Sequence, residues 1–418
     1  MRFSRFCLHR SAFRMSPLFL IFFTVFIDMV GFGIVIPVLP LYAEHFHATP
    51  FEIGWLTGIY SGMQILFVPI LGRLSDRFGR RPILIVSLAG TALGFLIMGW
   101  ASTLPLLFVA RIIDGASGGN ISTAQAYIAD ISTPENRSRS MGVIGAAFGL
   151  GFTFGPMIGG LMSRISYGAP FYFAAALAAL NVALLYFILP ESLSAEYRSR
   201  PRERTRLAEI FLHGHGSLFA VIVAAYFFAV SGFSIMTTLF ALFTEKRFGF
   251  TARETGYVFG LIGILSVILQ GGLIGRLIKM FGETALARAG LFLLAISLGL
   301  LPLVANIPAL LAVCAALAIA NGLTTPTLNG LASQMIDRGW QGRALGLMQS
   351  AAALARLVGP LLGGWLLMFD LSRPLRDYAR TPLFASGAIL LVAFALALGF
   401  RKPAGDTLQP PIAVESDV

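Results

Sequence analysis

The feature that most constrains this chain is a series of long apolar stretches separated by short polar segments. Each stretch is long enough to cross a bilayer as a helix, which takes about 20 apolar residues. The stretches are continuous rather than alternating in polarity, so they favour membrane helices over β-barrel strands. With 56% hydrophobic and only 12% charged residues, a soluble core is excluded. We therefore expect an all-α polytopic membrane protein with twelve transmembrane helices, near residues 17–42, 53–73, 83–101, 106–130, 140–163, 170–189, 218–243, 255–276, 285–304, 308–335, 344–368 and 382–400.

Three sequence motifs occur twice in the chain. The basic turn Gly72-Arg-Leu-Ser-Asp-Arg-Phe-Gly-Arg-Arg-Pro82 recurs in degenerate form as Gly275-Arg-Leu-Ile-Lys-Met-Phe-Gly282. In the same order, Gly155-Pro-Met-Ile-Gly-Gly160 recurs as Gly359-Pro-Leu-Leu-Gly-Gly364, and a third pair, starting at Arg139 and Arg343, has the same offset. The repeat predicts two pseudo-symmetric six-helix halves, an architecture that places a transport site between the halves near mid-membrane.

Lysine and arginine are concentrated in alternate connections between the predicted spans. Because positive residues hold loops on the cytoplasmic side, we expect both termini in the cytoplasm of a cell with this protein in its inner membrane. The net charge of +11 has this origin, so no nucleic-acid partner is predicted. The expected divisions are a basic leader at 1–16, halves at 17–189 and 218–400, a linker at 190–217 and a tail at 401–418. The run after residue 16 is too long for a signal-peptide core, although the leader leaves an organelle address open.

The fifth predicted span carries small residues at helical spacing. Such residues let another helix approach closely, and a proline inside the span removes a backbone hydrogen bond and bends the helix. Ordinary helix packing is the alternative explanation, but the longer pattern and its second copy favour a specialised role. The residues are Gly151, Gly155, Pro156, Gly159 and Gly160.

These motifs together resemble those of the major facilitator superfamily, and within it the twelve-helix drug:proton antiporters. The basic turn at Gly72 resembles the signature of the loop between helices 2 and 3, and Arg111-Ile-Ile-Asp-Gly115 resembles the fourth-helix motif. The segment from Gly155 resembles the antiporter motif of the fifth helix. The first span, Asp28 to Pro40, is similar to that of the tetracycline-resistance branch. The resemblance implies a transporter that works by alternating access.

Asp28 lies near the middle of the first span, where a charge costs roughly 2.5–3.5 kcal/mol even on a lenient insertion scale. The carboxyl group must therefore be protonated, solvated or paired, which predicts a proton carrier, with a fixed structural ion pair as the alternative. Arg356, near the middle of the eleventh span, is the candidate partner, and Phe152 occupies the equivalent position of the first half. Arg356 either binds an anionic substrate or neutralises Asp28 when the proton leaves.

Arg111 and Asp114 are three residues apart in the fourth span, a spacing that suits either an intrahelical ion pair or a proton relay. The family resemblance favours a coupling role for Arg111. It also implies that Asp130 meets Arg80, and that Asp76 faces the amino end of the eleventh helix and locks an inner gate. The degenerate copy has Lys279 instead of the acid, so the lock is expected in one half only. The gating residues are Gly72, Asp76, Arg77, Gly79, Arg80, Arg81 and Asp130.

Buried amides inside the spans either line the route or bridge helices. Relatives in the tetracycline branch carry acids in the third and ninth helices, but here the third-helix place is Gly94 and residues 285–304 contain no acid. A tetracycline–magnesium substrate is therefore not expected. The two cysteines have no metal-ligand spacing, so neither a metal nor a cofactor is predicted. The candidate cavity residues are Gln64, Asn120, Gln125, Asn321 and Gln349.

The sequence thus predicts a monomeric, proton-coupled exporter of small amphipathic or drug-like compounds, whose partners are its substrate, protons and the bilayer. A symporter or facilitator that imports a metabolite is the first alternative. A transport-inactive sensor or scaffold is the second. An enzyme is not predicted, because no cluster of nucleophile and base or of metal ligands is recognisable.

Overall fold

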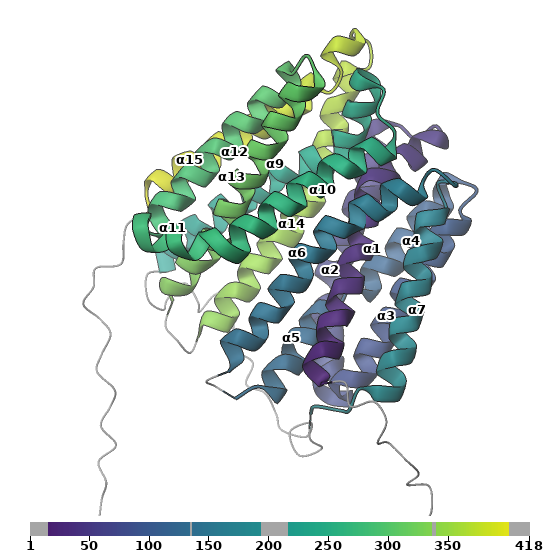
Figure 1. The fold of residues 1–418 in the computed structure, drawn as a ribbon, viewed down its shortest axis with the longest axis vertical. Coiled ribbons are helices and arrows are strands. Elements are labelled where there is room, and N and C mark those ends of the chain that lie inside the picture. The colour runs from purple at the N-terminus through teal and green to yellow at the C-terminus, as the bar shows by residue number, and fades with distance from the viewer. Residues whose placement is uncertain (1–15, 134–135, 194–215, 337–339, 401–418) are drawn as a thin grey trace, which may run out of the picture.

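The computed structural model describes residues 16–133, 136–193, 216–336 and 340–400, almost all of them in helices (Figure 1). Within these ranges, eleven helices are long and apolar enough to cross a membrane. A twelfth crossing is made by two shorter helices in succession. The expected all-α membrane fold is confirmed. The predicted leader except its last residue, most of the predicted linker and the predicted tail lie outside the described residues.

The first half starts with a helix whose amino end is capped by Ser16, with a proline in the first turn. The second helix has a capping box in which Thr49 and Glu52 satisfy each other's backbone N–H groups. The helices of this half are α1 (Pro17–His45), α2 (Pro50–Phe78), α3 (Arg80–Trp100), α4 (Leu104–Ser117), α5 (Asn120–Ile131), α6 (Arg137–Met162) and α7 (Ala169–Ile188).

The second half repeats this start, with a capping box at Thr251 and Glu254. Its second crossing contains a π-helical turn, η2 (Leu269–Leu273), between two α-helical pieces. The α-helices are α9 (Gly216–Phe248), α10 (Ala252–Ile268), α11 (Ile274–Phe281), α12 (Glu283–Leu300), α13 (Ile307–Gln334), α14 (Gln341–Leu367) and α15 (Arg380–Leu398). Short 3₁₀ turns are η3 (Leu301–Leu303), η5 (Met368–Asp370) and η6 (Leu375–Asp377).

The prediction of one continuous helix at 106–130 is wrong, because α4 ends at Ser117 and α5 begins at Asn120. The break falls on Gly118 and Gly119, which lie against α2. A Cβ atom on Gly118 would lie 2.6 Å from the Gln64 amide nitrogen, and one on Gly119 would lie 2.6 Å from a Leu71 methyl carbon. Paired glycines permit such a kink. The break turns Asn120 into the first residue of a new helix.

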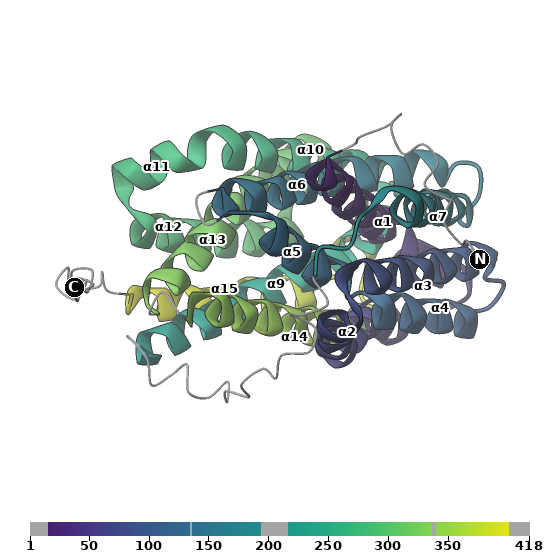
Figure 2. The same ribbon diagram turned by 90° about the horizontal axis from the view of Figure 1, so that it is seen from below.

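Two helices in each half are joined by glycine contacts that follow the repeat. Gly155 of α6 packs on the backbone of Val30 in α1, and the equivalent Gly359 of α14 packs on the backbone of Ser231 in α9. One turn further on, Gly160 meets Ala252 of the other half, while Gly364 meets Pro50. Thus α6 and α14 each pack against a helix of their own half and a helix of the other half, as Figure 2 shows.

The two halves meet at one end of the bundle and diverge at the other (Figure 1). At the end where they meet, called here the tight end, Gly54 packs against Pro360 and Gly256 against Pro156. The opposite end carries the loop from Gly72 to Pro82 and is called the basic-loop end. There, Cβ atoms added to Gly72, Gly142, Gly145, Gly271, Gly272, Gly275, Gly342 and Gly346 would meet nothing within 4 Å.

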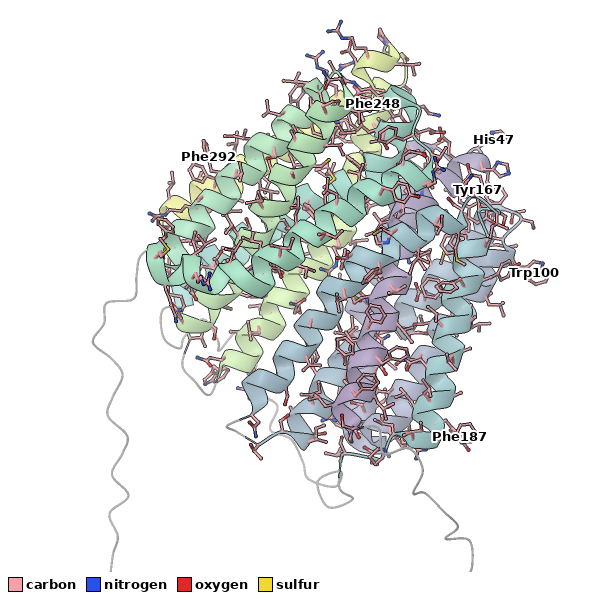
Figure 3. The ribbon with its side chains drawn as sticks, viewed as in Figure 1. His47, Trp100, Tyr167, Phe187, Phe248 and Phe292 are labelled. Carbon is pink, nitrogen blue, oxygen red and sulfur yellow. The ribbon has the colours of Figure 1, made fainter. Side chains whose placement is uncertain are left out.

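Large aromatic side chains project outward from the bundle, as Figure 3 shows for Trp100 and Phe187 at opposite ends of the first half. Trp100 is 78% exposed and Phe187 67% exposed. Aromatic residues at both rims are typical of the two interfaces of a membrane. The outer surface is therefore suited to lipid.

Candidate functional site

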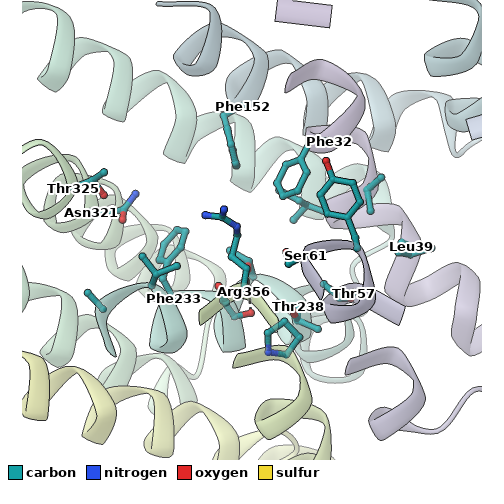
Figure 4. A pocket seen from close by; sticks show the side chains of 18 of the residues that line it. Phe32, Leu39, Thr57, Ser61, Phe152, Phe233, Thr238, Asn321, Thr325 and Arg356 are labelled. Atoms are coloured by element: carbon teal, nitrogen blue, oxygen red, sulfur yellow. Dashed lines mark hydrogen bonds between the residues drawn. The ribbon is translucent and has the colours of Figure 1, made fainter. Parts of the chain in front are cut away.

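A cavity of about 270 Å³ lies between the two halves. Its walls come from α1, α2, α4 and α6 of one half and from α9, α12, α13 and α14 of the other. The lining is mainly apolar and aromatic, with a small set of hydroxyl, amide and guanidinium groups, which is typical of a small-molecule site. The close-up in Figure 4 shows Phe32 and Phe152 on one side, with Phe233 and Arg356 across from them.

Asp28 lies in α1, just behind the cavity wall, and is 8% exposed. The side-chain amide of Asn120 donates a hydrogen bond of 2.5 Å to the Asp28 carboxyl group. The amide oxygen of Asn120 accepts from the backbone N–H of Ile121, so the amide is oriented. The break between α4 and α5 thus places a neutral donor on Asp28, rather than a cation.

Arg111 in α4 is 2% exposed and has three separate partners. Its guanidinium lies 3.1 Å from the Asp114 carboxyl group and 4.3 Å from the centre of the Tyr60 ring. Its Nε also donates to the backbone carbonyl of Leu56, at 3.4 Å. The intrahelical pair expected from the spacing of Arg111 and Asp114 is therefore present, and it is anchored to α2.

Tyr60 lies among the charged groups around the cavity, and sequence reasoning missed it. Its hydroxyl accepts a hydrogen bond of 3.0 Å from Gln64. The ring lines the cavity, and its electrostatic neighbours include Asp28, Asp114, Arg111 and Arg356. The sequence could have indicated Tyr60, because it lies one helical turn before the candidate cavity residue Gln64 in a predicted span.

Arg356 reaches into the cavity from α14, as Figure 4 shows. Its titratable neighbours are Tyr226 and Tyr60, both of which line the same cavity. Among the described residues no carboxylate forms an ion pair with it, and Asp28 is bonded to Asn120 instead. The pairing of Asp28 with Arg356 stays a prediction for another conformation. Phe152, the repeat equivalent of Arg356, also lines the cavity.

The five expected cavity amides are placed differently from one another. Asn321 lines the cavity. Gln64 and Asn120 instead hydrogen-bond Tyr60 and Asp28, while Gln125 and Gln349 are exposed and are not among the residues that line the cavity. Hydroxyl groups in α9 supply polarity to the cavity that most of the amides do not. Their helical spacing was visible in the sequence and could have identified them. They belong to Ser234, Thr237 and Thr238.

The basic turn forms a network of charges at its end of the bundle. Arg80, 5% exposed, bonds the Asp76 carboxyl group at 2.6 Å and the Asp130 carboxyl group at 3.1 Å. The expected contact between Arg80 and Asp130 is thus present. Gly79 has a φ of +109°, a conformation that suits glycine, and it separates α2 from α3. Arg77 lies over the Phe78 ring, and Arg81 donates to the carbonyl of Tyr186.

Glu191 was not predicted from the sequence. Its carboxyl group accepts the backbone N–H groups of Arg80, at 2.8 Å, and Arg81, at 3.2 Å. A carboxylate at the start of a helix is favoured by the helix dipole. The chain after α7 is thereby tied to the basic turn, a contact between residues about a hundred positions apart that has no local sequence signal.

At the tight end an ion pair crosses between the halves. Lys246 of α9 lies 2.7 Å from the Glu44 carboxyl group of α1 and 3.3 Å from that of Glu245. The pair is about one-third exposed, so it contributes on the order of 0–1 kcal/mol. Together with the glycine contacts it holds this end of the cavity closed.

Gly94 of α3, where relatives were expected to carry an acid, packs directly against α4. A Cβ atom there would lie 2.9 Å from the Cβ of Asp114. The nearby carboxyl group thus comes from α4, and a larger residue at 94 would collide with it. Within the described ranges, no group of three or more His, Cys, Asp or Glu side chains is placed to hold a metal ion.

Comparison with known proteins gives consistent matches along the chain. The family model of the Major Facilitator Superfamily matches residues 21–355 and, overlapping these, 271–415. Tetracycline resistance protein, class C, of Escherichia coli is 35% identical over 83% of this chain and 88% of its own length. Multidrug resistance protein 2 of Bacillus subtilis is 30% identical over 91% of this chain and 94% of its own length.

Among solved structures, the human organic anion transporter MFSD10 superposes with a TM-score of 0.70 at 25% identity. The superposition covers 91% of this chain and 98% of that one. The sequence matches, the helical fold and the cavity between two halves agree. The chain therefore belongs to the Major Facilitator Superfamily, within its branch of tetracycline and multidrug resistance transporters.

Proposed function

We propose that the protein is a proton-coupled exporter of small amphipathic or drug-like compounds, which carries them across the inner membrane by alternating access. The observation that carries the proposal is a cavity between the halves, closed at one end, with a buried acid behind its wall that no cation of the described residues balances. Relatives named for tetracycline and multidrug resistance support drug transport.

The basic-loop end is assigned to the cytoplasm, because arginines gather there and positive loops stay inside. Both termini then lie in the cytoplasm. On this assignment the cavity opens inward, and the contacts of Gly160, Gly364 and Lys246 close the outer side. The network of Arg80 with Asp76 and Asp130 belongs to the inner gate, which closes when the outer side opens.

Asp28 is proposed as the proton carrier, and Asn120 as the residue that positions the Asp28 carboxyl group. Arg111, Asp114 and Tyr60 link Asp28 to the cavity. A proton taken up from outside returns the carrier to the inward-open state. Release of that proton to the cytoplasm, followed by substrate binding, turns the carrier outward again.

The names of the relatives do not give the charge of the substrate. They include tetracycline, unspecified drugs and, for MFSD10, organic anions. The cavity itself favours a compound with an aromatic or apolar body, since Phe32, Phe152 and Phe233 line it.

Proteoliposomes with a pH-sensitive dye inside and an acidic lumen test the proposal. Candidate compounds are added outside, and the lumenal pH is followed. Antiport exchanges lumenal protons for substrate, so the lumen becomes more alkaline. Asp28→Asn should reduce this response by about 100-fold or more, since a lost proton-transfer group costs that order.

Other changes of the lumenal pH would identify other functions. Acidification of the lumen means that protons enter with the compound and favours a symporter. No response to any compound, from protein that binds them, favours a sensor or scaffold. Either result contradicts the proposed antiport.

A further inference from the structure

The charges on the cavity wall are unequal. Of the residues that the structure describes, two arginines, Arg111 and Arg356, line the cavity, and no aspartate or glutamate does. The acids nearest to it, Asp28 and Asp114, lie behind the wall. The space open to a ligand therefore has cations on its surface and no anions.

Arg111 is already neutralised within the protein. Its guanidinium bonds the Asp114 carboxyl group at 3.1 Å, covers the Tyr60 ring at 4.3 Å and donates to Leu56. Because Asp114 balances its charge and its side chain is only 2% exposed, Arg111 presents no uncompensated charge to a ligand. The positive charge of the cavity that is not balanced within the described protein is therefore that of Arg356.

Arg356 has no such partners among the described residues. The titratable groups near Arg356 are the neutral phenols of Tyr60 and Tyr226. An isolated charged arginine in the middle of a membrane helix is unfavourable unless it is solvated or paired. A cavity open to solvent lowers this cost by hydrating the guanidinium, whereas a cavity closed at both gates does not.

The surroundings of Arg356 suit the rest of an amphipathic anion. Figure 4 shows the guanidinium directed into the cavity between Phe152 and Phe233, with Asn321 and Thr325 beside it. A guanidinium binds a carboxylate through two parallel hydrogen bonds, and an amide and a hydroxyl add further contacts. Aromatic rings on both sides accept an apolar body.

We infer that the cavity binds amphipathic organic anions, with the carboxylate or sulfonate of the ligand paired to Arg356. The transport of such anions rests on the proposed function, whereas their binding does not. The anion supplies the counter-charge that Arg356 lacks, so a loaded cavity loses water at lower cost than an empty one. Arg356 thereby selects the substrate class and favours movement of the loaded carrier.

Binding to the full-length protein in lipid nanodiscs tests the inference. The probes are pyrenebutyrate, which is an anion, neutral pyrenebutanol and cationic pyrenebutylamine, and their fluorescence anisotropy is measured at neutral pH. The wild-type protein should bind the carboxylate at least about tenfold more tightly than the alcohol, equal to about 1.4 kcal/mol. The amine should bind more weakly than both.

Substitutions then assign the preference to one side chain. Arg356→Gln should bring the carboxylate to within about twofold of the alcohol without weakening the alcohol. Arg356→Lys should retain part of the preference, because it keeps the charge but not the planar fork. Arg276→Gln removes an exposed arginine of the same half outside the cavity, and it should behave as the wild-type protein does.

Several results would overturn the inference. These are equal binding of carboxylate and alcohol by the wild-type protein, no carboxylate binding, or an equal loss of both probes in Arg356→Gln. Inorganic phosphate that displaces pyrenebutyrate at similar concentrations would mean a general anion site without selection for an apolar body. Proton-coupled export of cations or neutral compounds alone would leave the proposed function standing while this inference failed.

Discussion

At the scale of single residues, the two buried acids near the cavity differ in what holds them. Asp114 has a guanidinium at 3.1 Å, whereas the partner of Asp28 among the described residues is the amide of Asn120 at 2.5 Å. A neighbouring cation holds a carboxylate in its charged form, so the carboxyl group without one exchanges a proton more readily. This difference is the reason for assigning the proton to Asp28 and a structural part to Asp114.

A double-mutant cycle on Arg111→Gln and Asp114→Asn should show strong coupling in thermal unfolding. Each single change leaves a buried group unpaired, at a cost of about 3–5 kcal/mol, while the double variant leaves a neutral pair. The partly exposed pair of Asp377 and Arg380, with the same spacing, is the control and should couple by about 1 kcal/mol or less. Additive losses at the buried pair would show that it is not a unit.

Sequence reasoning found most of the charged residues but not their neighbours. Asp28, Arg111 and Arg356 stand out because charges are rare inside apolar spans. Tyr60 and Glu191 do not stand out, since an aromatic residue in a membrane helix is common and a contact across the fold leaves no local pattern.

At the scale of helices, the glycines of α6 make two kinds of contact, which their spacing in the sequence does not distinguish. Gly155 faces α1 of the same half, whereas Gly160 faces α10 of the other half. The first contact holds a half together, and the second holds the halves to each other. Only the second is expected to break during transport.

Gly160→Ala tests this distinction. The added Cβ would lie 2.6 Å from the carbonyl oxygen of Ala252, so it should destabilise the closed tight end by about 1–3 kcal/mol. Spin labels on exposed His47 and Arg376 should then report longer distances. Gly145→Ala, in the same helix, adds a Cβ with nothing within 4 Å and should leave the distances unchanged. Equal effects of the two changes would refute a separating role for Gly160.

The basic turn at Gly72 and its degenerate copy at Gly275 predict different effects for equivalent substitutions. Asp76 bonds Arg80 at 2.6 Å, whereas its counterpart Lys279 is exposed on α11. Asp76→Asn should therefore slow transport by about tenfold, the effect of losing a charge-assisted bond, while Lys279→Gln should have little effect. Transport rates in proteoliposomes measure both, and equal rates in the two variants would contradict a one-sided lock.

At the scale of the whole molecule, the repeat in the sequence anticipated two halves, and the glycine contacts follow that repeat. The break in the fourth crossing was not anticipated, because glycines in a membrane helix more often serve packing than kinking. Which end is closed was beyond sequence reasoning for a physical reason. One sequence encodes both conformations of a carrier, and they differ by a few kcal/mol at most.

The central claim is that protonation of Asp28 decides which end of the cavity is open. Distances between spin labels measure this in nanodiscs, with one pair at His47 and Arg376 and another at Ile131 and Gly346, in a chain lacking Cys7 and Cys314. In acid, the first pair should be close and the second far apart. In alkali with a transported compound present, the first should lengthen as the second shortens, and Asp28→Asn should stay in the acid arrangement. Distances that change together, or an Asp28→Asn variant that responds to pH as the wild-type protein does, would contradict the account.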